Sequence, residues 1–258
     1  MQFTPLASSS SGNCILLSEQ NTHILIDCGI SGKAVKAALD CAGVNGEDIR
    51  AIIVTHEHSD HIKGLGILSR KYNIPIYANS KTWSKMGFLL GNLAMENIHC
   101  FQNDTPFLLH NIRIQPFPIP HDAADPVGFN FWNEQDVKCT LATDIGHLND
   151  DLFNEIKGSK KVLLESNHDV EMLKNGSYYY GLKQRILGEL GHLSNDNAAR
   201  LACRLVQNGT EQITLAHLSC ENNTPQIAHK TVCSYLKEQG IKEGSDVKIE
   251  VAPKMKIV

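Results

Sequence analysis

The sequence predicts an α/β fold in which two packed β-sheets carry helices on both outer faces. Short apolar runs rich in β-branched residues alternate with amphipathic segments of helical periodicity. The 258 residues, of which 42% are hydrophobic, are enough to bury a substantial core. Neither a repeat nor a low-complexity linker interrupts the chain, so we expect one domain over residues 1–258, built as a four-layer αββα sandwich.

Apolar, mostly β-branched runs predict the strands in order along the chain. After an opening strand that ends before residue 8, they cover residues 15–17, 24–26, 50–54, 112–119, 139–142, 161–164, 213–216 and 247–251. Turn-forming residues or helical patterns separate these runs, as expected for strands that alternate with helices.

Start and stop signals predict the helices. Ser31 is a suitable N-cap for a helix with an apolar face, and Gly43 is placed to end it. Ser194 precedes a second such helix, and Thr224 followed by Pro225 starts a third. A further helix is predicted over residues 62–68.

The densest chemical signal lies directly after the strand at residues 50–54. His56, His58, Asp60 and His61 offer three imidazoles and a carboxylate, which suit zinc, iron or manganese. Side chains alternate in an extended segment, so His56 and His58 point to one side, while the other two fall at a helix start. Two pairs aimed at adjacent points favour two metals over one, and the alternative is a polar surface loop.

The same pattern recurs at other strand ends, which argues against a surface loop. Five predicted strands each lead into a His or Asp, namely Asp27, the His56 segment, His121, Asp144 and His217. Ligands bind beyond the strand ends of layered sheets, so these residues predict one convergent site.

With these residues the chain resembles the metallo-β-lactamase fold hydrolases, whose motif His-x-His-x-Asp-His is matched at positions 56–61. The resemblance implies two divalent cations per chain, Zn²⁺ or Mn²⁺, with iron as a further option. It implies that Asp27 orients ligands without binding metal. By the same resemblance, one cation is bound by His56, His58 and His121, the other by Asp60, His61 and His217, and Asp144 bridges them.

A narrower resemblance covers essentially the whole chain. Motifs at residues 8–13, 55–65, 121–124, 165–169, 191–195 and 216–219 resemble the YycJ/WalJ-type branch, bacterial cytosolic members regarded as DNA exonucleases. Ser9 departs from the glycine that is usual there. DNA is therefore the expected substrate, cleaved by a hydroxide that bridges the two cations. An oxygen ligand at Asp144, where lactamases of the fold commonly carry Cys, favours a phosphodiesterase or a thioester hydrolase.

Other residues are candidates for positioning the hydroxide, for proton donation and for phosphate binding, and several have an alternative role. Asp60 and Asp27 are expected to position the hydroxide and its ligands, and either His168 or His192 is a candidate general acid, with packing as the alternative role for both. The loop at residues 8–13, with Ser10, Ser11 and Asn13, is expected to bind a phosphate through its hydroxyls and backbone N–H groups, unless it is a plain hairpin turn. Ser194 begins a helix whose N-terminus favours a phosphate.

The net charge limits the classes of substrate that the protein is expected to bind. The net charge of −4 does not indicate a general nucleic-acid binder, so any DNA surface must be local. The candidates are basic residues in two places, with a solvated helix face as the alternative for each. They are Lys63, Arg70 and Lys71 on the helix after the motif, and Lys174, Lys183 and Arg185 around the tyrosines at 178–180. The competing function is a small-molecule hydrolase acting on a cyclic phosphodiester or a thioester, and purely structural metals rank below both.

The cysteine pattern and the hydropathy of the chain indicate its cellular compartment. Its eight cysteines form no Cys-x-x-Cys pair and no dense framework, which is typical of reduced thiols in the cytoplasm. No signal peptide and no long apolar run are apparent. We therefore expect a cytoplasmic protein with no membrane association and no obligate protein partner.

Overall fold

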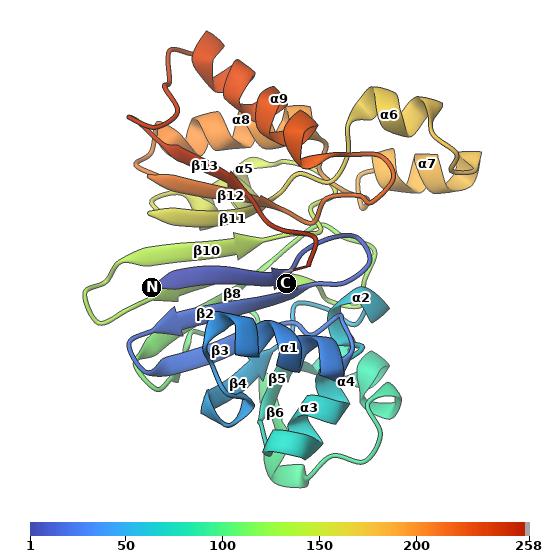
Figure 1. The fold of residues 1–258 in the computed structure, drawn as a ribbon, viewed down its shortest axis with the longest axis vertical. Coiled ribbons are helices and arrows are strands. Elements are labelled where there is room, and N and C mark those ends of the chain that lie inside the picture. The colour runs from blue at the N-terminus through green and yellow to red at the C-terminus, as the bar shows by residue number, and fades with distance from the viewer. Residues whose placement is uncertain (256–258) are drawn as a thin grey trace.

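A computed structural model describes residues 1–255, which fold around two β-sheets (Figure 1). The first sheet has the order β1 (Gln2–Ala7), β2 (Cys14–Glu19), β3 (Thr22–Ile26), β4 (Ile49–Ile53), β5 (Ile76–Asn79), β6 (Ile98–Phe101). The second has the order β13 (Lys248–Val251), β12 (Gln212–Ala216), β11 (Lys161–Glu165), β10 (Lys138–Ala142), β9 (Val127–Trp132), β8 (Ile112–Pro118), β7 (Phe107–Leu109). Strands β3 to β6 are parallel, as are β10 to β13.

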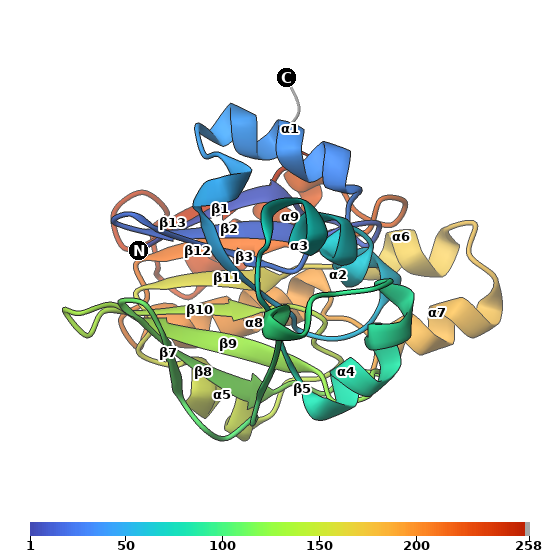
Figure 2. The same cartoon turned by 90° about the horizontal axis from the view of Figure 1, so that it is seen from below.

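Helices cover the outer face of each sheet, as the sequence predicted (Figures 1 and 2). On the first sheet lie α1 (Gly32–Ala42), α3 (Leu65–Tyr72) and α4 (Ser80–Met86), with the single turn α2 (Ser59–Ile62) at its edge. On the second lie α5 (Asp150–Ile156), α8 (Asn195–Val206) and α9 (Pro225–Glu238). The short pair α6 (Val170–Asn175) and α7 (Tyr180–Leu187) projects from one side of the sandwich, and 3₁₀ turns span Gly46–Asp48, Gly87–Leu89 and Met95–Asn97.

Strand alternation divides the core into layers. In β3, Ile24 and Ile26 pack between the sheets, whereas Leu25 packs under the helices of the first sheet. In β12, Leu215 faces the helices of the second sheet and Ala216 faces the other sheet. Period-two alternation with both strand faces buried produces this four-layer arrangement, and it confirms the predicted fold class.

The predicted helix caps are confirmed. The Ser31 hydroxyl accepts from the Ala34 N–H at 3.2 Å, and Gly43 ends α1 with a left-handed φ of 72°. Ser194 and Thr224 cap α8 and α9 in the same way. Within residues 1–255, none of the helices has both the length and the apolar character needed to cross a membrane.

The single helix predicted over residues 62–68 is wrong. Helix α2 ends at Ile62, and α3 begins only at Leu65. Between them the Gly64 N–H donates to the Cys28 carbonyl at 2.7 Å, and a Cβ on Gly64 would lie 2.4 Å from the Ile30 carbonyl oxygen. The backbone turns here to pack against the loop after β3, a long-range contact that helical periodicity cannot reveal.

Candidate metal centre

The predicted strand-end residues meet at one edge of the sandwich. Asp27 follows β3 and the His56 segment follows β4 in the first sheet, while His121, Asp144 and His217 follow β8, β10 and β12 in the second. Asp27, Asp144 and His217 have left-handed φ values of 57°, 61° and 56°. Such backbone conformations are unfavourable for residues other than glycine and concentrate at functional sites. Each one turns the chain sharply as it leaves its strand.

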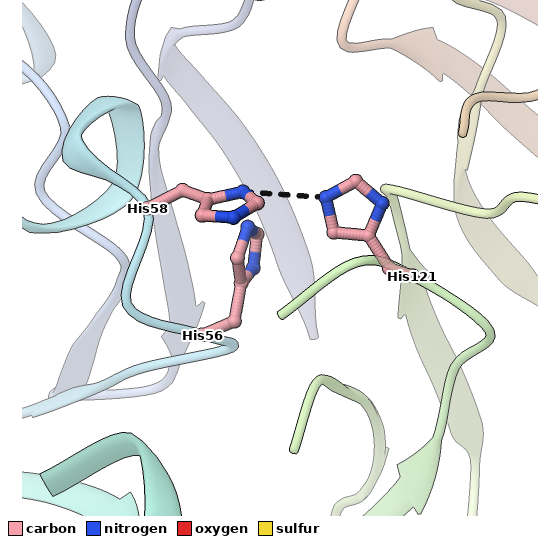
Figure 3. Close-up of side chains that lie close together, drawn as sticks. All are labelled: His56, His58 and His121. Carbon is pink, nitrogen blue, oxygen red and sulfur yellow. Dashed lines mark hydrogen bonds between the residues drawn. The ribbon is translucent and has the colours of Figure 1, made fainter. Parts of the chain in front are cut away.

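Three imidazoles form the first group of this centre (Figure 3). One ring nitrogen from each of His56, His58 and His121 lies within 4.8 Å of the others. His121 Nε2 is 3.3 Å from His58 Nδ1, and the rings of His56 and His58 are 4.6 Å apart at an interplanar angle of 80°. The ring nitrogens thus converge on one point, as a shared cation requires.

A second group lies beside the first. The Asp60 Oδ2 atom is 3.3 Å from His61 Nε2 and 3.5 Å from His217 Nε2. Asp144 lies between the two groups, because its Oδ2 is 3.4 Å from His61 Nε2 and its Oδ1 is 3.8 Å from His121 Nε2. These are the groups that the sequence resemblance implied.

Two buried atoms indicate that this geometry fits cations. His56 Nε2 and Asp144 Oδ2 are shielded from solvent and have no hydrogen-bond partner among the described residues. A buried polar atom without a partner costs free energy, and cations held at this centre would satisfy both atoms. The imidazole and carboxylate donors match the preferences of zinc, manganese and iron.

The carboxylates and histidines of this centre shift one another's pKa values. Burial alone would raise the pKa of Asp60 and Asp144, but the facing histidines lower both below their usual value. Burial opposes protonation of His61 and His217, yet the carboxylates raise the pKa of His61 and bring that of His217 to about 10. Burial lowers the pKa of His56 well below its usual value. Ionised carboxylates therefore sit beside the neutral imidazole of His56, whereas a cation would have to displace a proton from His61 and from His217 as it binds.

Asp27 orients His61 from outside the two groups. Its carboxylate accepts hydrogen bonds from the Thr55 N–H at 2.9 Å, the Thr55 hydroxyl at 2.8 Å and His61 Nδ1 at 2.8 Å. With its Nδ1 proton held by Asp27, His61 presents Nε2 to Asp60 and Asp144.

Glu165, which sequence reasoning missed, does the same for two other histidines. Its fully buried carboxylate accepts from His192 Nδ1 and His217 Nδ1, each at 2.9 Å. It also accepts from the backbone N–H groups of Ile145 at 2.6 Å and Leu193 at 3.1 Å. The signal was available, because Glu165 ends the apolar strand β11 as the other acidic residues end theirs.

The two candidate general acids differ in their surroundings. His192 lines the cavity at the centre, and its side chain is 17% exposed. His168 is buried, neither of its ring nitrogens has a partner among the described residues, and burial lowers its pKa to about 4. It does not line the cavity.

The cavity over the centre measures about 200 Å³. A wider groove of about 530 Å³ runs between α8 and α9, but it contains none of the predicted ligands. The chemistry therefore places the site in the smaller cavity. Its lining consists of Ser10, His58, Asp60, Asp144, Asn167, Tyr178, Leu182, Arg185, Ile186, His192, His217 and Ser219.

The backbone N–H groups of the loop at residues 8–13 do not form the predicted anion nest, and the loop is a hairpin turn between β1 and β2. Its N–H groups already donate to protein acceptors: Ser9 to Asn13 Oδ1, Ser10 to the Leu218 carbonyl, and Ser11 to the Ser9 hydroxyl. The Gly12 and Asn13 N–H groups donate to the carbonyls of Ser9 and Asp60. No backbone donor of residues 9–13 remains for a phosphate.

The predicted substrate-binding side chains divide into two sets. Ser10 lines the cavity, and the Asn13 amide nitrogen is 3.4 Å from Asp60 Oδ2. Arg185 also lines it and donates from Nη2 to Asp122 Oδ1 at 3.0 Å. Asn13 is not part of the lining, and neither are the other three: Ser11 Oγ is 3.3 Å from Cys220 Sγ, Ser194 Oγ accepts from the Asn197 N–H, and Lys183 Nζ donates to the Lys174 carbonyl.

Comparison with known proteins identifies the class that this fold and centre define. Residues 22–218 match the family model described as "Beta-lactamase superfamily domain", and the chain belongs to that superfamily. It is 41% identical over 256 residues to "Exodeoxyribonuclease YycJ" of Bacillus anthracis, covering 99% of this chain and 97% of the relative. It is 40% identical over 250 residues to "Exodeoxyribonuclease WalJ" of Streptococcus pneumoniae, covering 96% and 93%.

A solved structure agrees with the fold. The metallo-beta-lactamase fold protein YhfI from Bacillus subtilis aligns with a TM-score of 0.72 over 98% of this chain and 96% of its own, at 17% identity. The chain is thus an enzyme of a hydrolase superfamily. Its own cluster of His and Asp side chains is compatible with a binuclear metal site.

Close backbone packing beneath the centre leads to a first prediction. A Cβ on Gly29 would lie 1.5 Å from the Asp60 carbonyl oxygen, so Gly29→Ala must displace the segment that carries Asp60. We expect a loss of at least roughly 1–3 kcal/mol in stability, as overpacking typically costs, together with weaker metal binding. Thermal unfolding and metal titration measure the two effects. Gly87→Ala is the control, since its Cβ would meet only Trp83 at 3.9 Å; equal melting temperatures for the two variants would refute the prediction.

Proposed function

We propose that the protein is a metal-dependent phosphodiester hydrolase that degrades DNA as an exodeoxyribonuclease. The observation that carries the proposal is Asp144, whose carboxylate lies between the two groups of ligands, 3.4 Å from His61 Nε2 and 3.8 Å from His121 Nε2, in a cavity that also contains Arg185. Two cations joined by a carboxylate suit the displacement of an oxygen at phosphorus. Full-length relatives named exodeoxyribonucleases support DNA as the substrate.

Each group of ligands would hold one cation. The first cation would be held by His56, His58 and His121, the second by Asp60, His61 and His217, and Asp144 would be shared by both. Two divalent cations, zinc, manganese or iron, would supply an activated water and offset the charge on the phosphodiester oxygens. Asp27 and Glu165 hold the imidazoles of His61 and His217 through their Nδ1 atoms. The orientation of the ligands is therefore set before substrate arrives.

We assign proton donation to His192. Its Nδ1 is engaged by Glu165, so Nε2 is the ring nitrogen left for a substrate in the cavity that His192 lines. From there it can protonate the oxygen that departs as the P–O bond breaks. His168 lies outside the cavity lining and supports the site by packing under this proposal.

The path for DNA runs over α7. Tyr178 and Arg185 line the cavity, while Tyr179 and Tyr180 beside them are 73% and 76% exposed. Exposed aromatic rings near basic side chains stack on bases while the charges contact phosphates. A cavity of about 200 Å³ is smaller than the roughly 300–1,000 Å³ typical of small-molecule pockets, which favours a polymer lying across the opening.

A direct assay tests the function. Purified protein loaded separately with zinc, manganese or iron is incubated with end-labelled single- and double-stranded DNA, beside a chromogenic phosphodiester and a thioester. We expect stepwise release of mononucleotides with at least one metal. Thioester hydrolysis with intact DNA would overturn the proposal and favour the small-molecule alternative.

Salt dependence tests the DNA path. If Lys183 and Arg185 each contact a phosphate, the double variant Lys183→Ala/Arg185→Ala should reduce the slope of log Kd against log salt by about 1.4–1.8, at roughly 0.7–0.9 for each lost contact. Fluorescence anisotropy with labelled DNA at several salt concentrations measures the slope. The variant Lys33→Ala/Lys36→Ala, on exposed positions of α1, is the matched control. Equal slopes in the two double variants would remove Lys183 and Arg185 from the path.

A further inference from the structure

A second cluster of metal-binding residue types lies on α9 and shares no residue with the candidate metal centre. His229 and Cys233 are four residues apart on the helix, so both project from the same face. Glu243 reaches them from the turn that follows α9 and precedes β13. One ligand atom from each of the three lies within 4.8 Å of the others.

Two contacts of this cluster can be compared with a tetrahedral site. His229 Nε2 is 2.8 Å from Glu243 Oε1, and Cys233 Sγ is 3.7 Å from His229 Nε2 and 3.8 Å from its Nδ1. Zinc binds nitrogen and oxygen at about 2.0–2.2 Å and sulfur at about 2.3 Å, which places tetrahedral ligand atoms roughly 3.3–3.7 Å apart. The His229 to Glu243 contact has to widen by about half an ångström on that geometry, and the imidazole has to turn so that Nε2 alone faces a metal shared with Sγ.

The surroundings suit three protein ligands and one water. The side chains of His229 and Glu243 are 38% and 40% exposed, so a fourth position can face solvent. Cys233 instead packs against the core under α9. Burial and the neighbouring Glu243 raise the pKa of the Cys233 thiol to about 12. A cation would therefore displace the thiol proton to solvent as the metal–sulfur bond forms, and apparent affinity should rise with pH.

We propose that His229, Cys233 and Glu243 form an additional binding site for a zinc-class divalent cation. A thiolate, an imidazole and a carboxylate suit borderline metals such as zinc or cobalt better than magnesium or calcium. The turn that carries Glu243 lies between Ile241 and Val247, both buried in the core under α8 and α9. A cation here ties that turn to α9 and stabilises this half of the fold. The inference does not depend on the proposed function.

Cobalt separates this site from the candidate metal centre. The predicted ligands of that centre are His and Asp, whereas the site on α9 contains a cysteine. A thiolate-to-cobalt charge-transfer band in the near ultraviolet therefore reports only on the α9 site. We expect metal-free full-length protein titrated with Co²⁺ to develop this band, and Cys233→Ser to lose it while keeping the visible cobalt absorption of the other centre.

Matched variants complete the experiment. Cys220→Ser, which alters another cysteine away from the cluster, should keep the band, and His229→Gln should weaken cobalt affinity at this site at least about ten-fold. The band should persist in Asp144→Asn protein, where the candidate metal centre is disrupted, so the result stands apart from any nuclease assay. Absence of the band from the unmodified protein, or its persistence in Cys233→Ser, would overturn the proposal.

Discussion

Replacing Asp144 with asparagine should lower DNA hydrolysis at least about 1,000-fold, because several kcal/mol of charge stabilisation depend on correctly held cations. Metal held by the candidate centre should fall from two ions towards one or none. Asparagine keeps the size of the side chain and tolerates the left-handed φ of 61°, so the change isolates the lost charge from backbone strain. Steady-state kinetics and elemental analysis measure the two effects.

Two comparisons make this result interpretable. Asp144→Ala should be equally inactive but less stable, since alanine adopts a left-handed backbone less readily than asparagine. Asp151→Asn, at an exposed position in the first turn of α5, should retain activity and metal. Unreduced turnover in Asp144→Asn protein would exclude a bridging role for this carboxylate.

The second large effect concerns Glu165. Glu165→Gln should reduce turnover roughly 10- to 100-fold, the range seen when a group that orients metal ligands is lost. His192 and His217 both donate to Oε1, and the Ile145 and Leu193 N–H groups both donate to Oε2, so the amide nitrogen of glutamine must face one of these two pairs of donors and repel it. We expect kcat to fall even at saturating metal, because His192 is misplaced as well as His217.

Controls separate this positioning role from simple loss of stability. Thermal unfolding defines the temperature range in which Glu165→Gln protein is fully folded, and kinetics are measured well below it. Glu134→Gln, at an exposed turn position, accounts for any general effect of removing a carboxylate. If kcat per folded molecule equals that of the unmodified protein, Glu165 has no part in orienting the histidines for catalysis.

The sequence predicted the layers and the strand-end residues well, because both depend on local patterns. Buried β-branched runs mark strands, and a charged or imidazole side chain directly after such a run stands out, as at Asp27 and His217. Spacing also placed His56 and His58 in one group and His61 in the other. These features survive into the structure because hydrophobic burial fixes the register of each strand.

Features that depend on contacts between distant parts of the chain could not be predicted from the sequence. The break at Gly64 exists because the loop after β3 packs against it, and the N–H of Ser10 is engaged by the Leu218 carbonyl from the other half of the chain. Glu165 gains its role only when β10 and β12 flank β11 and bring His217 within reach. Residue types and spacing do not specify such pairings, which arise from how the two sheets dock.

Both ligand groups draw on both sheets. His56 and His58 come from beyond β4 and meet His121 from beyond β8, just as Asp60 and His61 meet His217 from beyond β12. Under the proposed metal binding, cation capture and docking of the two sheets are therefore linked equilibria, so each stabilises the other. We expect a chelator to loosen the contact between the two halves at this rim, and partly folded chains to acquire ions only as the halves come together.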